Sequence, residues 1–199
     1  MARYTGPSCK LCRREGKKLF LKGDRCLTDK CALSRRATVP GQHGAGRKTV
    51  KEYGMQLREK QTARRYYGVQ EGQFETYYEM ADKKEGIAGE NLLSILECRL
   101  DNIVYRMGLA SSRKEARQFV RHAHFMLNGK KVDIPSYRLN AGQTVAVRAK
   151  SAGTDRFKAI AEQAGRPLPK WLTFDMETLS GAVVALPDRE DIDLTIEEH

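Results

Sequence analysis

Long hydrophobic runs are missing from this sequence. No apolar stretch approaches the roughly 18 residues that a membrane-spanning helix requires. The N-terminal residues Met1–Pro7 also lack the apolar segment that a signal peptide contains. We therefore expect a cytoplasmic protein, in which cysteine thiols are kept reduced and a cysteine cluster indicates metal binding rather than disulfides.

Signatures of catalysis are missing as well. The chain has no nucleophile elbow and no pattern of paired carboxylates. The segment Gly41–Thr49 resembles a phosphate-binding GxxxxGK[ST] loop, but Arg47 lies between Gly46 and Lys48. That spacing matters, because the lysine must reach the terminal phosphates while backbone amides hold the others. We expect no enzyme, and an extended loop that lies on an RNA backbone is the alternative role for this segment.

The domain organisation follows from length and from clusters of glycine and proline. The chain has 199 residues, of which 40% are hydrophobic, so it can bury one large core or two small ones. Internal repeats and low-complexity tracts are absent. Glycine and proline clusters near residues 38–46, 86–89, 151–153 and 165–169 mark provisional boundaries. The blocks that result are 1–50, 51–90, 91–150 and 151–199.

Positive charge is plentiful and unevenly distributed. The net charge is +11, with 36 Lys and Arg against 25 Asp and Glu. The net charges of the four blocks are +10, −1, +7 and −5 in chain order. Charge that served solubility alone would follow length, so the first and third blocks are the expected contact surfaces for a polyanion. Nucleic acid is the partner that we infer.

Four of the five cysteines fall in the first 31 residues. Cys9 and Cys12 form one close pair, and Cys26 and Cys31 form a second pair after thirteen intervening residues. Two close pairs joined by a loop allow four thiolates to bind one ion. A segment with few large apolar side chains benefits from such a cross-link. Zinc is the default ion, and an iron–sulfur cluster is the alternative.

The third block contains a regular helical pattern. Apolar residues recur every three or four positions from Leu93 to Met107, which predicts one amphipathic helix that includes Cys98 as a buried thiol. Gly108 can end this helix. Ser112 and Glu115 then offer a capping box for a second helix.

The second helix is expected to carry a row of cations. Its buried stripe consists of Ala116, Phe119, Val120 and Ala123. Arg113, Arg117 and Arg121 recur every four residues with Lys114 beside them, so we expect them along the exposed face, away from that stripe. If Arg117 contacts RNA, the Arg117→Ala variant should flatten the salt dependence of binding by about one unit.

A hairpin and a further strand follow this helix. Asn128-Gly129 is a strong two-residue hairpin signal, and Lys130 and Lys131 come directly after it. Residues 144–148 alternate as a strand does. A helix pair on a small sheet suits either a DNA groove or the shape of RNA, and the periodicity does not separate the two.

Specific segments resemble the small-subunit ribosomal protein four family of bacterial type. They are Arg99–Ala110, Ser111–Val120 and Leu127–Lys130 in the third block, and Ala2–Pro7, Cys9–Gly16, Gly41–Gly44, Lys60–Gly68 and Pro169–Leu172 elsewhere. The resemblance covers essentially the whole chain, and it favours RNA over DNA.

The resemblance implies an α+β fold. It consists of a largely helical N-terminal domain with the four-cysteine metal module, plus an inserted domain of a helix pair packed on a small antiparallel sheet. Residues 151–199 would return to the N-terminal domain. In function, the resemblance implies a structural constituent of the small ribosomal subunit that binds the 5′ domain of its RNA and nucleates assembly. The implied partners are this RNA, small-subunit protein five, with which the family influences translational accuracy, other ribosomal proteins, and messenger RNA near the entry channel.

The predicted site residues are the cysteines and the cations of the two basic blocks. The metal ligands are Cys9, Cys12, Cys26 and Cys31. The predicted RNA contacts are Arg13, Arg14, Lys17, Lys22, Arg25, Arg35, Arg36, His43, Arg47, Lys48, Arg64, Arg65, Arg113, Lys114, Arg117, Arg121, Lys130 and Lys131. The tyrosines that follow Arg64 and Arg65 are expected in the helix core.

Two other classes of protein compete with this interpretation. An RNA-modifying enzyme can carry a similar small basic domain, but no room remains here for a catalytic domain. A zinc-dependent DNA-binding regulator is permitted by the cysteines and the helix pair alone. Equal affinity for duplex DNA and ribosomal RNA would support that regulator.

Overall fold

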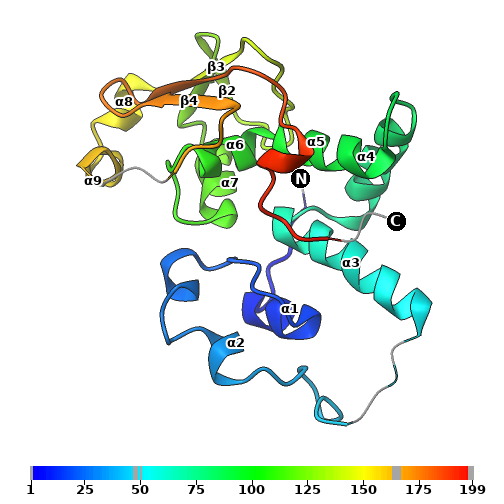
Figure 1. Ribbon diagram of the computed structural model, residues 1–199. Coiled ribbons are helices and arrows are strands. Elements are labelled where there is room, and N and C mark those ends of the chain that lie inside the picture. The colour runs from blue at the N-terminus through cyan, green and yellow to red at the C-terminus, as the bar shows by residue number, and fades with distance from the viewer. Residues whose placement is uncertain (1, 47–48, 50, 163–166, 197–199) are drawn as a thin grey trace. The chain divides into compact units, whose positions relative to one another are not determined.

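The chain folds into two compact units. A computed structural model describes residues 2–46, 49, 51–162 and 167–196 (Figure 1). The first unit comprises Met1–Glu79 and the chain from Leu194 onward, and the second comprises Met80–Asp193. The second unit is therefore inserted into the first, as the family resemblance implies. None of the described helices is long and apolar enough to cross a membrane.

The first unit is helical wherever its described residues form regular structure. Its elements are α1 (Ser8–Glu15), the short 3-10 helix η1 (Gly23–Cys26), α2 (Ala32–Arg35), α3 (Glu52–Tyr67) and most of α4 (Glu71–Asp82). Helix α1 packs on α2 and α3. Tyr66 and Tyr67 are buried, which confirms their expected place in the core, whereas residues 1–50 bury only Leu19, Leu21 and two cysteines among their described large apolar side chains. The cysteine segment therefore has little hydrophobic core of its own.

The apolar stripe of the second unit lies on two helices, α5 (Ala88–Glu97) and α6 (Leu100–Arg106). The prediction of one continuous helix is wrong at Arg99, whose backbone is extended. The reason is a neighbouring segment: the Leu100 N–H donates to Tyr137 O and the Leu139 N–H donates to Cys98 O, both at 2.8 Å. Periodicity survives such a break, and every expected stripe residue is buried. Burial raises the pKa of Cys98 to about 11, as suits a core thiol.

Helix α7 (Arg113–Arg121) begins at an N-cap residue, Ser112. The Ser112 hydroxyl accepts a hydrogen bond from the Glu115 N–H at 3.3 Å, as predicted. The Glu115 carboxylate, however, accepts from the N–H and hydroxyl of Ser111, both at 2.6 Å, one residue before the expected partner. Ala116 and Val120 are buried as expected, and Phe119 is half-buried.

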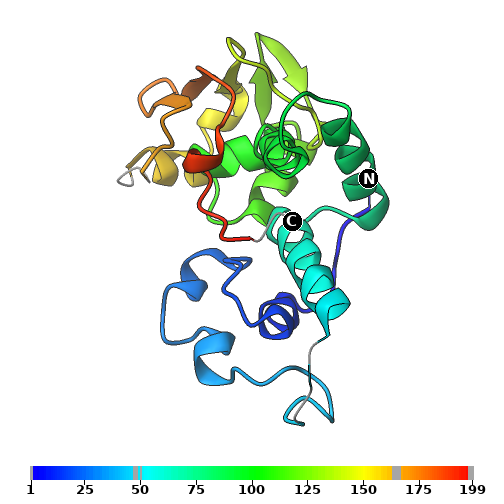
Figure 2. The same cartoon turned by 45° about the vertical axis from the view of Figure 1, so that its right-hand side comes forward.

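A five-stranded antiparallel sheet completes the second unit, in the order β2-β1-β3-β5-β4. The strands are β1 (Phe125–Leu127), β2 (Lys130–Val132), β3 (Thr144–Val147), β4 (Leu172–Asp175) and β5 (Ser180–Val183). Asn128 and Gly129 have φ values of 46° and 77°, which is the turn that the Asn-Gly signal predicts. Side chains of α6, α7 and the sheet form one hydrophobic core, and Figure 2 shows these elements together.

Residues 151–199 do not return as a block to the first unit, and that expectation is corrected. Helices α8 (Ala149–Ala152) and α9 (Asp155–Glu162) lead to β4 and β5, and β5 pairs with β3. A short 3-10 helix, η2 (Arg189–Asp191), follows. Only the chain from Leu194 belongs to the first unit. Strands β4 and β5 are short, so apolar and polar residues alternate only briefly on either side of the turn near Leu179. The local sequence pattern therefore did not show that β5 pairs with β3.

Candidate nucleic-acid interface

The four N-terminal cysteines lie on three short elements of the first unit. Cys9 and Cys12 belong to α1, Cys26 ends η1, and Cys31 is the residue before α2. Cys26 and Cys31 are each 8% exposed, and the first pair is half-buried. Three short segments of the first unit thus contribute the four thiols.

Electrostatics supports this grouping. Burial raises the pKa of Cys12, and ionised Cys26, Cys9 and Cys31 each raise it further. The pKa of Cys31 is lowered, chiefly by the backbone N–H of Ser34. Among the described residues, no three His, Cys, Asp or Glu side chains are arranged as a metal site. The chemistry of the donor set still fits zinc, so the metal remains a prediction.

A buried ion cluster joins α1 to α3. The Glu15 side chain is fully buried and pairs with Arg65 and, at 3.1 Å, with Arg58. Burial raises the pKa of Glu15, and the two arginines oppose that rise. Arg65 is thus held against a carboxylate of its own unit. Its neighbour Arg64 lies 3.2 Å from Glu71.

Several other predicted contacts of the first unit also have internal partners. Arg13 Nε donates to Thr38 O, Lys17 Nζ pairs with Glu59, Arg25 Nε donates to Lys30 O, Arg35 Nε donates to Asp29 O, and Arg36 Nε donates to Thr38 Oγ1. Arg14, Lys22 and His43 are exposed. Arg47 and Lys48 lie outside the described residues. Five of the predicted contacts of this unit thus have partners within the same unit.

The row of cations on α7 does not stand clear of the core. Arg113 is 8% exposed, its Nε donates to Asn102 Oδ1 at 2.8 Å, and its guanidinium lies 4.5 Å from the centre of the Tyr105 ring. Arg117 Nη1 lies 2.9 Å from Asp101 Oδ2. The expectation of an exposed row is therefore wrong for these two arginines, because polar groups on α6 face them.

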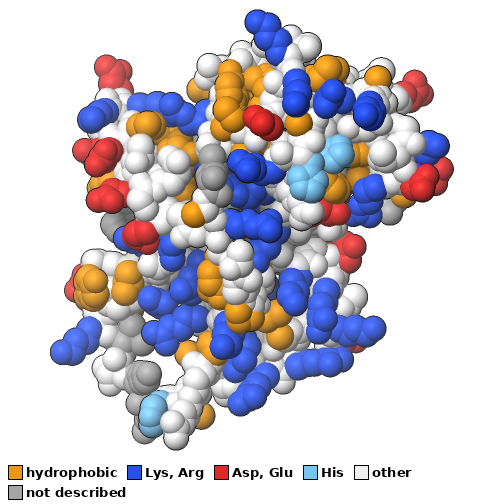
Figure 3. Space-filling model, turned by 180° about the vertical axis from the view of Figure 1, so that it is seen from behind, with side chains coloured by type: hydrophobic (Ala, Val, Ile, Leu, Met, Phe, Trp, Pro, Cys, Tyr) orange, Lys and Arg blue, Asp and Glu red, His pale blue; other side chains and the backbone are white. Residues whose placement is uncertain are grey.

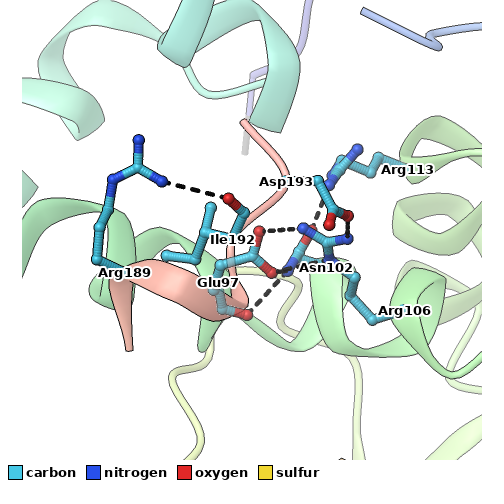
Figure 4. A network of polar contacts seen from close by, with 7 residues as sticks. All are labelled: Glu97, Asn102, Arg106, Arg113, Arg189, Ile192 and Asp193. Carbon is cyan, nitrogen blue, oxygen red and sulfur yellow. Dashed lines mark hydrogen bonds and ion pairs between the residues drawn. The ribbon is translucent and has the colours of Figure 1, made fainter. Parts of the chain in front are cut away.

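Asp101 and Asn102 belong to a buried polar network. Asp101 accepts two hydrogen bonds from the buried Arg99, at 3.0 and 2.7 Å. Asn102 Nδ2 donates to Glu97 O at 2.9 Å, and the fully buried Glu97 carboxylate accepts from Arg106 at 2.6 and 3.0 Å. Arg106 Nη1 reaches Asp193 at 2.5 Å, as Figure 4 shows. Contacts from Asn102 and Asp101 of α6 to Arg113 and Arg117 thereby fix the orientation of the basic helix α7.

Three of the predicted RNA contacts in the second unit do face solvent. Arg121 at the end of α7 and Lys130 and Lys131 on β2 are exposed, and Lys114 is half-buried. Figure 3 shows Lys and Arg side chains predominating over Asp and Glu on the face drawn. A surface of this kind attracts a polyanion, and it rests on a helix that the network keeps in place.

Known proteins match this chain along its whole length. Residues 3–97 match the family "Ribosomal protein S4/S9 N-terminal domain", and residues 98–145 match the "S4 domain" family. The small ribosomal subunit protein uS4 of Acetivibrio thermocellus is 65% identical over 200 aligned residues, which cover 100% of this chain and 96% of the relative.

The chain belongs to the uS4 family. The uS4A protein of Alkaliphilus oremlandii is 63% identical and the uS4 protein of Ruminiclostridium cellulolyticum is 62% identical, with the same coverage of 100% and 96%. The resemblance seen in the sequence is therefore confirmed. The matched S4 domain ends at residue 145, within β3, so β4 and β5 extend the uS4 sheet beyond that match.

Sequence reasoning missed the residues that support the uS4 surface. Glu97, Asp101 and Asn102 were passed over because they interrupt an otherwise apolar stripe. That interruption is the signal that could have found them, since charged residues are rarely buried unless they are paired. Three polar residues on the buried side of a helix pattern indicate arginine partners, which here follow 9, 11 and 16 residues later along the chain.

Proposed function

We propose that this chain is a structural constituent of the small ribosomal subunit, in the cytoplasm, and that it binds the 5′ domain of small-subunit RNA without catalysing a reaction. The full-length match to uS4 proteins carries this proposal. The exposed cations on α7 and β2 supply its physical basis.

The arrangement suits recognition of RNA by shape. A folded RNA presents phosphates at fixed spacings, and a rigid protein surface matches them at a low entropic cost. In the second unit, Asn102 and Asp101 hold α7 while Arg121, Lys130 and Lys131 remain exposed. Phosphate contacts of this kind make affinity strongly dependent on salt.

A salt titration tests the proposal. Binding of the full chain to the 5′ domain is measured from low to physiological salt, with transfer RNA and duplex DNA as competitors. Preference for the 5′ domain by orders of magnitude at physiological salt is the expected result. Equal binding of all three would reduce the function to generic attraction of polyanions, and turnover of a modified RNA would reveal an enzyme.

We further propose that binding nucleates assembly of the 5′ domain and that small-subunit protein five and messenger RNA near the entry channel are partners. The family resemblance supports these roles. Chemical probing of the 5′ domain should show native protections that appear on addition of this chain alone. Protections that require every other protein would contradict nucleation.

We also propose that Cys9, Cys12, Cys26 and Cys31 hold one structural zinc ion, with an iron–sulfur cluster as the alternative. Support comes from the donor set and from the electrostatic coupling among the four thiols. A bound ion would cross-link a segment that has little apolar core. Elemental analysis of protein purified without added metal should give one zinc per chain, and a visible absorption band would indicate iron and sulfur instead.

A further inference from the structure

Two histidines meet between helix α7 and strand β1. The chain reverses at Ala123, whose φ of 57° is left-handed, and the rings of His122 and His124 come to 6.1 Å between centroids. Figure 3 shows the two histidine side chains of the second unit next to each other at the surface. Neither residue was among the predicted contacts.

The ring of His124 is held in a fixed position. Its Nδ1 lies 2.9 Å from the Ser151 hydroxyl, and its faces and edges meet Phe119 and Phe157 at centroid distances of 5.8 and 5.6 Å. With Nδ1 engaged by Ser151, contact with a ligand is left to Nε2. A ring anchored in this way needs no further ordering when it binds.

Positive charge gathers around that ring. Arg148 at the end of β3 is tied to the same turn, because its Nη1 donates to Ala123 O at 3.1 Å and its N–H donates to His124 O at 2.9 Å. Burial lowers the pKa of His124, and the charges of His122 and Arg148 lower it further. The other groups packed on the ring are Ser151 of α8, Phe119 of α7 and Phe157 of α9, and none of them titrates near neutral pH.

An anion would reverse this balance. Two rings and a guanidinium that repel one another's charge are stabilised together by one negative group placed between them. A phosphate of RNA supplies that charge and accepts hydrogen bonds from imidazole and guanidinium N–H groups. The exposed Arg121 precedes the pair on α7, so the patch continues the surface already described.

We propose that His122, His124 and Arg148 form a binding site for an RNA phosphate, and that the histidine pair takes up a proton when the phosphate binds. The inference rests on the proposed RNA binding and adds a dependence on pH to it. Affinity for RNA then increases as pH falls through the range in which histidine titrates.

Binding of the full chain to the 5′ domain of small-subunit RNA tests this at pH 8.0 and pH 6.0. The salt is held constant between the two pH values, and no chelator is added, so that any metal on the four cysteines stays in place. Coupling of one proton with a pKa change of about one unit predicts tighter binding at the lower pH, with about tenfold as the upper limit. His122→Gln should lose most of that gain while keeping the anchored His124 ring. His122→Lys, charged at both pH values, should bind tightly at pH 8.0 and show a flattened profile.

Arg121→Gln is the matched control. It removes a neighbouring permanent charge, so it should weaken binding by the same factor at both pH values. A wild-type pH profile in both His122→Gln and His124→Gln would overturn the proton-linked site. Failure of the proposed function looks different, because the 5′ domain would then lose to transfer RNA at both pH values.

Discussion

In the first unit a buried carboxylate, Glu15, ties α1 to α3 where few apolar side chains are available, whereas in the second unit buried polar groups lie within a continuous hydrophobic core. Both units are rich in arginine, and in both units several arginines pair with buried carboxylates of the same unit. In the second unit the predicted contacts that remain exposed lie at the end of α7 and on β2. The count of cations in a block therefore overstates its contact surface.

Metal removal should have the largest effect, and it should destabilise the first unit while leaving the second unit folded. Structural zinc contributes on the order of 10 kcal/mol of apparent folding free energy in small modules. A strong chelator should abolish protection from hydrogen exchange in residues 8–35 and leave residues 93–147 protected. Exchange measured peptide by peptide gives the answer. Equal loss in both units, or no loss in the first, would break the comparison.

The second unit should depend most on its buried acid. Glu97→Ala leaves the largely buried Arg106 without its main partner and should lower the free energy of unfolding by about 3 to 5 kcal/mol. Urea unfolding followed by fluorescence of Trp171, which is buried in the second unit, measures it. Asp193→Asn is the control, because that carboxylate is 73% exposed and its loss should cost less than about 1 kcal/mol.

Arg117→Ala should act on stability rather than on salt dependence alone. Asp101 would lose one of its two arginine partners, and a hydrogen bond to a charged group contributes about 1.5 to 3 kcal/mol. The same fluorescence experiment measures the loss. If the unfolding midpoint is unchanged and the salt dependence of RNA binding is flatter, Arg117 contacts RNA directly.

The cap of α7 should respond to pH. Burial alone would raise the pKa of Glu115, but hydrogen bonds from Ser111 and the charge of Arg156 bring it below its usual value. A lowered pKa in the folded state means that the stabilisation is present above the ordinary glutamate range and is lost as pH falls through it. Glu115→Gln should cost about 1 kcal/mol at pH 7. That cost should shrink as pH falls below the ordinary glutamate range and towards the lowered pKa of the folded state; a constant cost would show that the charge is irrelevant.

Arg121→Ala should leave stability almost unchanged, within about 0.5 kcal/mol. Its effect should appear in the salt titration, where the slope falls by about one unit. Arg121 and Arg117 thus form a matched pair four residues apart on one helix. If both variants change the slope equally, the division between scaffold and contact surface within α7 is wrong.

Much of the fold could be predicted because it depends on local signals. The Asn128-Gly129 turn, the Ser112 cap and the buried stripe each reflect a short-range rule, and each is confirmed. The break at Arg99 could not be predicted, because its cause is the segment at Tyr137, far along the chain. The pairing of β5 with β3 could not be predicted for the same reason.

In the candidate site, too, features set by local sequence could be predicted and features set by distant residues could not. The cysteine pattern and the lysines after the turn are both readable locally; the two lysines are exposed, whereas the metal on the cysteines stays a prediction. The burial of Arg113 depends on an amide eleven residues earlier, and that of Arg65 depends on Glu15, fifty residues earlier. Helical periodicity gives the direction of a side chain on its own helix, but it does not show what packs against that side chain.

The insertion of one unit into the other has a consequence for biosynthesis. The first unit begins at the N-terminus but is completed by residues from Leu194 onward, of which Leu194 itself is 7% exposed. At typical elongation rates, the chain between Glu79 and Leu194 takes on the order of ten seconds to make. The second unit has all of its strands before then. The unit that is started first is thus the last to be finished.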